Sequence, residues 1–232
     1  MKDGSLEWVE YTSVNTVVTR GRERIVKEVG LNIVINKRHF ATAMIMPTME
    51  KEFVIGHLFA QGVINSITDI KSITIKHNIA EVVLPEIKNN KDAPAIHSDF
   101  KVRREEIFNS VKAILKSEIF TETEAVHSAG LFRQGAEAIC LAEDIGRHNA
   151  LDKVIGYGLL NNIDFSHTLV ASTGRQPVEM ILRCCRANIP IIATKGVPTT
   201  LAINTAKKAG LAIAGLVRGD TMIIYTNPAR IE

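Results

Sequence analysis

Three successive units, each made of a short apolar run, a polar loop and a segment of helical periodicity, constrain the fold of this chain most strongly. The apolar runs read EAICLA at 137–142, HTLVAS at 167–172 and PIIAT at 190–194, and the helical patterns extend through Leu160, Asn188 and Lys208. Two further runs, LAIAGLV and MIIYT, follow them as strands. Repeated strand–loop–helix units are typical of parallel strands covered by helices. The second half of the chain is therefore predicted to be an α/β core.

The first third of the chain has a different pattern, rich in strands and with one helix. Residues 31–46 alternate apolar and polar positions around an Asn-Lys turn, which predicts a β-hairpin. Residues 47–64 begin with Pro-Thr and carry apolar residues at near-helical spacing, which predicts a helix. The remaining predictions are strands over 70–76 and 79–84, a polar loop over 85–101 and an amphipathic helix over 102–118.

These patterns predict two parts. Residues 1–100 form a smaller β-rich N-terminal part with one helix, and residues 101–232 form an α/β core around a mixed sheet. A chain of 232 residues is long enough for one large domain or a domain with a smaller companion.

Composition excludes several classes of protein. The formal net charge of +3 is too small to predict a nucleic-acid partner. No apolar run reaches the roughly 18 residues of a membrane span, and the N-terminus lacks the apolar core of a signal peptide, so a cytoplasmic protein is expected. The three cysteines, Cys140, Cys184 and Cys185, do not suit a disulfide framework, and all three fall on predicted core elements.

Glycines and cations follow three of the predicted strands. The loops are Glu143–His148, Ser172–Gln176 and Lys195–Thr200. Because the carboxyl ends of parallel strands meet at one edge of a sheet, we expect these loops to lie together. The following helix starts offer free N–H groups to an anion, and Arg147, Arg175 and Lys195 add positive charge. The sequence therefore predicts a phosphate-binding edge.

Each feature of this edge also has a plain structural interpretation. Small polar loops follow strands in most α/β proteins, and His148 could simply cap or pack. Asp152 and Lys153 are expected on a solvated helix face. The motifs for P-loop hydrolases, dinucleotide redox enzymes and serine esterases are absent, and zinc deaminases are disfavoured because H-x-E and P-C-x-x-C are missing.

Several long motifs together resemble the formate dehydrogenase accessory protein family, FdhD/NarQ. They are EDIGRHNALDKVIG, STGRQPVEM, PIIATKGVPTTLAINTAKKAG and IAGLVRGDTMIIYTNPARI, and MPTMEKEFVIGHLFAQGVI resembles the N-terminal helix of the family. The resemblance spans residues 20–231. It implies a fold similar to cytidine deaminase, with a three-layer core but without zinc, and a homodimer in the cytoplasm.

The resemblance also implies a function and a ligand. Family members bind the molybdenum bis(molybdopterin guanine dinucleotide) cofactor, for which GDP is a mimic, and pass sulfur from a cysteine desulfurase to it before it enters formate dehydrogenase. The implied cofactor-binding residues are His127, Asp144, Arg147, His148, Ser172, Thr173, Gly174, Arg175, Lys195, Leu216, Val217, Arg218, Gly219, Asp220 and Thr221. No catalytic residue and no metal ligand is predicted.

Two departures from the family pattern leave the sulfur step open. The Cys-x-x-Cys that carries the persulfide in the family is absent from the loop at 85–101. The family motif Thr-Gly-Gly-x-His appears as TEAVH, in which Thr123 and His127 match but Glu124 and Ala125 replace the glycines. Two hypotheses follow: a sulfur-transferring accessory protein, or a cofactor-binding carrier that has lost sulfur transfer because a persulfide needs a thiolate.

Overall fold

A six-stranded mixed sheet forms the centre of the larger part of the molecule. The computed structural model describes residues 4–89 and 94–232. The strand order is β12-β11-β10-β9-β7-β8. These strands are β7 (His127–Arg133), β8 (Glu137–Asp144), β9 (Leu169–Ser172), β10 (Ile191–Thr194), β11 (Ala212–Arg218) and β12 (Thr221–Thr226). β9, β10 and β11 are parallel, as the repeated units predict, while β7 and β12 run in the opposite direction.

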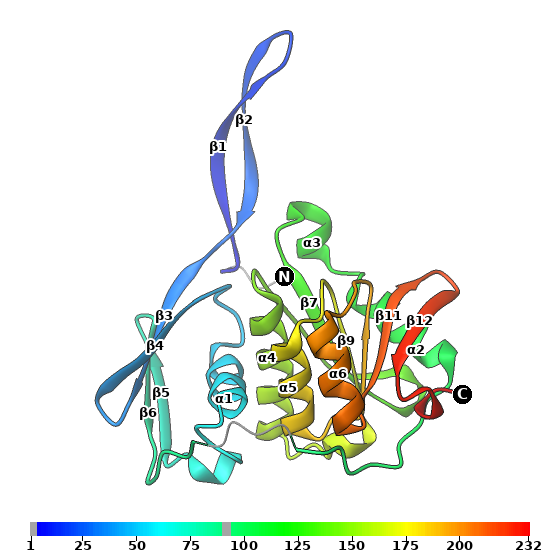
Figure 1. Ribbon diagram of the computed structural model, residues 1–232. Coiled ribbons are helices and arrows are strands. Elements are labelled where there is room, and N and C mark those ends of the chain that lie inside the picture. The colour runs from blue at the N-terminus through cyan, green and yellow to red at the C-terminus, as the bar shows by residue number, and fades with distance from the viewer. Residues whose placement is uncertain (1–3, 90–93) are drawn as a thin grey trace.

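Helices cover both faces of this sheet and make three layers (Figure 1). α4 (Arg147–Leu160), α5 (Val178–Ala187) and α6 (Thr200–Ala209) lie side by side on one face. α2 (Arg104–Ile114) lies on the other, where its apolar residues pack with those of β9, β10 and β11. The predicted α/β class and mixed sheet are confirmed, whereas the similarity to cytidine deaminase stays a prediction.

β7 is a strand of the larger sheet that the sequence pattern missed. It pairs antiparallel with both β8 and β9 and thereby separates them. Since β8 is antiparallel to β7, it still runs in the same direction as β9, so its carboxyl end lies at the same edge of the sheet. The first residue of β7, His127, lies at that edge too, opposite Asp144 at the end of β8.

The N-terminal part contains a four-stranded sheet and one long helix. The strands are β3 (Val29–Ile35), β4 (Arg38–Ile45), β5 (Ser72–Lys76) and β6 (Ile79–Val83), in the order β4-β3-β6-β5, and the helix is α1 (Glu50–Ala60). Asn36 and Lys37 both have positive φ in the turn between β3 and β4, as a two-residue hairpin requires. The predicted hairpin, helix and two later strands are confirmed.

α1 packs directly against α4. A Cβ on Gly56 would lie 1.8 Å from the backbone oxygen of Asp152, and a Cβ on Gly156 would lie 1.8 Å from that of Glu52. Only glycine fits at these two positions, because the helices touch backbone to backbone. The N-terminal sheet and the larger sheet consequently share one apolar cluster, which reaches from Leu31 to Ile213.

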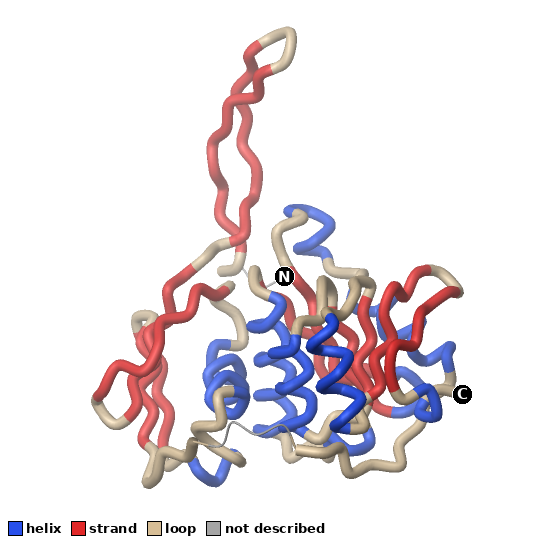
Figure 2. The backbone as a smooth tube through the Cα atoms, in the orientation of Figure 1, coloured by secondary structure: helices blue, strands red, loops and turns tan. Residues whose placement is uncertain are grey.

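A long β-hairpin projects from the body of the protein (Figures 1 and 2). It consists of β1 (Leu6–Val14) and β2 (Val18–Val26), which form a two-stranded sheet of their own. We call residues 6–26 the arm. The sequence patterns identified the first third of the chain as β-rich but did not identify this hairpin.

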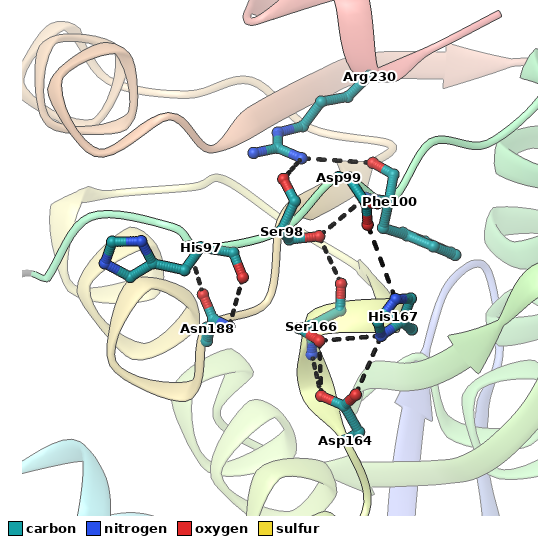
Figure 3. Close-up of polar contacts among 9 residues, drawn as sticks. All are labelled: His97, Ser98, Asp99, Phe100, Asp164, Ser166, His167, Asn188 and Arg230. Atoms are coloured by element: carbon teal, nitrogen blue, oxygen red, sulfur yellow. Dashed lines mark hydrogen bonds and ion pairs between the residues drawn. The ribbon is translucent and has the colours of Figure 1, made fainter.

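The described residues of the predicted loop, 85–89 and 94–101, contain no helix or strand, and residues 90–93 lie outside the described part. Polar contacts fasten the second piece to the core (Figure 3). Asn188 exchanges hydrogen bonds with the backbone of His97, and Arg230 donates to the backbone oxygens of Ser98 and Phe100. These hydrogen bonds fix residues 97–100 on the core a few residues before α2 begins.

The helix predicted over 102–118 ends at Ile114 and is followed by the short helix α3 (Glu118–Thr123), which leads into β7. Within residues 4–89 and 94–232, no helix is long and apolar enough to cross a membrane.

Candidate functional site

The loops at the carboxyl edge of the sheet are joined by backbone hydrogen bonds. The Gln176 N–H donates to the Val197 oxygen at 2.9 Å, and the Leu216 N–H donates to the Gly196 oxygen at 2.8 Å. The Thr173 N–H donates to the Ser128 oxygen at 2.9 Å, which adds the start of β7. The strand-end loops therefore meet at one edge, as the sequence predicts.

A cavity of about 450 Å³ opens at this edge. Five of the predicted site residues line it, namely His127, Thr173, Gly174, Lys195 and Arg218. Phe120 and Glu124 of the α3 region complete its wall. We call this the strand-end cavity.

Glycines allow the loops to approach each other closely around the strand-end cavity. A Cβ on Gly196 would lie 2.1 Å from the Gly174 oxygen, so no other residue fits there without displacing the backbone. Thr194 Oγ1 donates to the same oxygen at 2.8 Å and accepts from the Gly196 N–H at 3.0 Å. Leu216 next to them has a φ of 50°, an uncommon left-handed conformation for leucine, at the point where the register of β11 against β12 shifts.

His127 is a neutral group in the wall of the cavity. Its Nδ1 lies 3.1 Å from Thr173 Oγ1, and the Ser128 N–H donates to the same hydroxyl at 3.0 Å. Burial lowers the pKa of His127 below its ordinary value of 6.5, and the positive charge of Arg147 lowers it further. A neutral imidazole can donate or accept a hydrogen bond without adding charge.

Arg147 and His148 begin α4 beside the cavity. Arg147 Cδ would lie 3.6 Å from a Cβ on Gly174, which places this side chain next to the cavity wall. Arg147 Nε and His148 Nε2 are both buried and have no hydrogen-bond partner among the described residues. Burial, Arg183 and Arg147 lower the pKa of His148. Arg147 therefore places a positive charge next to the cavity, whereas His148 does not line the cavity and lies near Arg183 and Glu179.

Asp144 shapes the site from inside rather than lining it. Its side chain is fully buried, and Oδ2 lies 2.7 Å from Lys153 Nζ. It also accepts hydrogen bonds from the Met46 N–H, the Gly146 N–H and the Asn149 side chain. The carboxylate thus joins the end of β8, the start of α4 and the segment that leads into α1.

The expectation that Asp152 and Lys153 lie on a solvated helix face is wrong. Both are fully buried. Arg183 forms two hydrogen bonds with the Asp152 carboxylate, at 2.7 and 3.2 Å, and His57 Nδ1 lies 3.2 Å from it. Although burial raises the pKa of Asp152, Arg183 and His57 hold it below its usual value. The charges after β8 therefore form two internal ion pairs that fix α4.

The remaining predicted site residues lie outside the cavity. Ser172 is buried and donates to the Thr173 oxygen at 3.3 Å, Val217 is buried against the α2 side of the sheet, and Arg175 is exposed. Gly219 and Asp220 are exposed in the turn between β11 and β12, and Thr221, the first residue of β12, is exposed as well. Whether they touch a ligand stays a prediction.

All three thiols are buried. Burial raises the pKa of Cys184 and raises that of Cys185 to about 11, so both are protonated near neutral pH. Their placement on core elements is as the sequence predicts. Across the described ranges, no three His, Cys, Asp or Glu side chains are grouped so that they could hold a metal ion.

Sequence reasoning missed the side of the cavity wall that α3 and its neighbouring residues form, including Phe120 and Glu124. Phe120 lies on α3, which no pattern predicted. Glu124 was noticed only as a substitution in the family motif, although its left-handed φ of 52° at the end of α3 turns the chain into β7.

The family model described as FdhD/NarQ matches residues 26–95 and 79–232, which together span most of the chain. The chain belongs to the FdhD/NarQ family. Its FdhD relatives include the sulfur carrier protein FdhD of Methanothermobacter thermautotrophicus, 31% identical over 229 residues that cover 90% of this chain and 92% of that protein. The sulfur carrier protein FdhD of Saccharolobus solfataricus is 36% identical over 214 residues, with 83% of each chain covered.

A solved structure extends the FdhD likeness to the whole fold. A Desulfotalea psychrophila protein, described as a formate dehydrogenase accessory protein, superposes with a TM-score of 0.89 at 28% identity. The match covers 98% of this chain and 99% of that chain. The family resemblance of the sequence motifs is thereby confirmed.

Proposed function

We propose that this chain is a formate dehydrogenase accessory protein that binds a guanine-dinucleotide arm of the molybdenum cofactor in the strand-end cavity. The observation that carries the proposal is the meeting of Lys195, Arg218 and His127 in the wall of one cavity, with the Arg147 side chain next to that wall. Cations and helix starts of this kind bind phosphate groups. The cofactor is the cargo of the protein rather than a resident group.

The chemistry of the cavity wall fits a guanine base as well as phosphates. Phe120 offers an aromatic ring for stacking. The Glu124 carboxylate can accept hydrogen bonds from the N1–H and the 2-amino group of guanine, a pair of donors that adenine lacks at the corresponding edge. A volume of about 450 Å³ is within the range of ~300–1,000 Å³ typical of small-molecule sites, so the cavity suits one nucleotide arm. The second arm would need a second copy, which is why a homodimer in the cytoplasm belongs to the proposal.

Two versions of this function differ in the sulfur step. Membership in a family of sulfur carriers favours a chain that passes sulfur from a cysteine desulfurase to the cofactor. The burial and raised thiol pKa of Cys184 and Cys185 argue against these two cysteines as persulfide carriers, since a persulfide forms on an accessible thiolate, and the second version is a carrier without sulfur transfer.

Calorimetric titration with GDP, ADP and inosine diphosphate tests the nucleotide site. We expect GDP to bind the wild type, and Lys195→Ala and Arg218→Ala each to weaken binding about tenfold, since a charge-assisted hydrogen bond contributes ~1.5–3 kcal/mol. Glu124→Gln should reduce the preference for GDP over inosine diphosphate, which lacks the 2-amino group. Lys112→Ala, an exposed change on α2, is the control. Equal and weak heats from GDP for the wild type and Arg218→Ala would refute the site.

A persulfide assay separates the two versions. The purified chain is incubated with a cysteine desulfurase and labelled cysteine, and each of its three cysteines is replaced by serine in turn. Label that disappears with one substitution supports sulfur transfer by that cysteine. A chain that binds GDP but takes no label supports the carrier.

A further inference from the structure

The arm has too little support in its own chain to be stable as described. Its strands pair with each other from Leu6 opposite Val26 to Val14 opposite Val18, and neither strand pairs with any other described strand. An isolated two-stranded hairpin is marginally stable at best in water. Its large apolar side chains nevertheless remain exposed, namely Trp8, Val9, Tyr11, Val14, Val17, Val18 and Ile25.

One face of the arm is basic. Side chains directly opposite each other share a face, so Trp8 with Arg24, Glu10 with Arg22 and Thr12 with Arg20 form one row. The row carries three arginines against one glutamate. We call it the arginine face.

At its base the arginine face already contacts an acidic surface of the same chain. Arg24 Nη1 lies 3.3 Å from Glu122 of α3. Glu118, on the same helix, is exposed and has no ion pair or hydrogen bond among the described residues. α3 thus offers more negative charge than its own arm uses.

The two outer arginines stand beyond the reach of this helix. Arg22 and Arg20 lie two and four residues closer to the tip of the arm than Arg24, which is about 7 and 13 Å at 3.3 Å per residue. Neither has an ion pair or a hydrogen bond within the described residues. A second copy of the chain supplies an identical acidic helix.

A cavity at the base of the arm, lined by both apolar and charged side chains, provides the matching place for its tip. It has a volume of about 450 Å³ and is lined by Leu6 and Arg24 of the arm, Ile119 of α3 and Leu141 of β8, among others. Leu141 belongs to the edge strand of the large sheet and is 49% exposed. Nine-residue strands span about 30 Å, so two arms lying antiparallel bring each tip to the other's base.

We propose that the arm docks on a second copy of this chain in a two-fold arrangement. Arg20 and Arg22 of each copy face α3 of the other, and the apolar tip around Val14 and Val18 enters the cavity at the partner's base. A two-fold contact of this kind is self-complementary and closed. The interface supplies the contact surface for the homodimer in the proposed function, but it does not depend on nucleotide binding.

A charge-swap experiment tests the interface by light scattering. The wild type should have twice the chain mass of 25.5 kDa. Arg20→Glu/Arg22→Glu and, separately, Glu118→Arg should each shift the protein to the monomer mass. Glu118 is chosen because its replacement leaves the Arg24–Glu122 pair intact. A mixture of the two variants should regain the dimer mass, since each interface then pairs opposite charges.

The control is Lys71→Glu/Lys76→Glu, which makes the same charge change at exposed positions of the small sheet and should stay dimeric. Far-UV circular dichroism checks that each variant is folded. A monomeric wild type, a dimer that survives the arginine reversal, equal loss in the control or a mixture that stays monomeric would each overturn the interface. Because GDP titration is measured separately, failure of the interface and failure of the nucleotide site are distinguishable.

Discussion

Replacing Lys153 by methionine measures how much the buried ion pair between Lys153 and Asp144, next to the candidate site, contributes to the free energy of unfolding. Lys153 Nζ lies 2.7 Å from Asp144 Oδ2, and both side chains are fully buried. Removing one partner of such a pair leaves an unpaired charge in the interior and costs about 3–5 kcal/mol of unfolding free energy. Lys153 also donates to the backbone oxygens of Met46 and Glu143, so we expect the upper half of that range.

Urea unfolding at pH 7, followed by far-UV circular dichroism, gives the change in stability. The single tryptophan, Trp8, lies on the exposed arm and does not report on the core. In a thermal scan a loss of about 4–5 kcal/mol lowers Tm by about 8–20 °C for a chain of this size. Lys101→Met is the matched control, because Lys101 and Glu232 form an exposed pair, for which ~0–1 kcal/mol is expected.

A double variant separates the pair from general damage to the core. Asp144→Asn together with Lys153→Met removes both charges and keeps one of the two carboxylate oxygens, which can accept from either the Met46 N–H or the Gly146 N–H. We expect the double variant to be more stable than the sum of the single losses by at least about 1 kcal/mol. The reasoning is refuted if Lys153→Met loses no more than Lys101→Met, or if the two single losses simply add.

Three further outcomes are expected. Gly196→Ala should weaken GDP binding at least about tenfold, because a Cβ there would lie 2.1 Å from the Gly174 oxygen, whereas Gly4→Ala, which meets nothing within 4 Å, should leave calorimetric affinity unchanged. The free energy of unfolding should fall as the pH drops from 6.5 toward the lowered pKa values of His127 and His148, because the unfolded chain binds protons there that the folded chain does not. The urea midpoints measured at pH 7 and at pH 5.5 should therefore lie closer together in His127→Gln/His148→Gln than in the wild type. An unchanged difference between the two midpoints would contradict this reasoning. The native thiols should react with a disulfide reagent only after urea is added, and rapid labelling of the folded chain would show that Cys140, Cys184 or Cys185 is accessible after all.

The local patterns of the sequence predicted most elements of the core correctly. The strands β9, β10 and β11 and the helices α4, α5 and α6 lie where apolar runs and helical periodicity place them, because each element buries a face that repeats at its own period. The order of the strands in the sheet could not be predicted in the same way. Nothing in the segment HSAGLFR indicates that β7 enters between β8 and β9, because strand neighbours are chosen by contacts across the whole sheet.

The sequence predicted where the candidate site lies, but it did not predict the buried ion pairs next to it. Glycines and cations after the strands marked the strand-end cavity, since sheet topology alone brings those loops together. The burial of Asp152 was invisible, because its partners His57 and Arg183 lie 95 and 31 residues away in the sequence. A charged residue next to apolar neighbours looks the same in sequence whether it faces water or a distant partner.

The glycine crossing of α1 and α4 limits how this protein can evolve and be engineered. Where two main chains touch at Gly56 and Gly156, there are no side-chain atoms that a compensating mutation could trim. Sequence drift on one helix therefore cannot be absorbed by the other, because any residue with a Cβ at either position would meet the main chain of the facing helix. Insertions and fusion partners should be tolerated in the outer turns of the small sheet, whereas one that moves α1 along its axis would separate that sheet from α4 and from the buried Asp144–Lys153 pair.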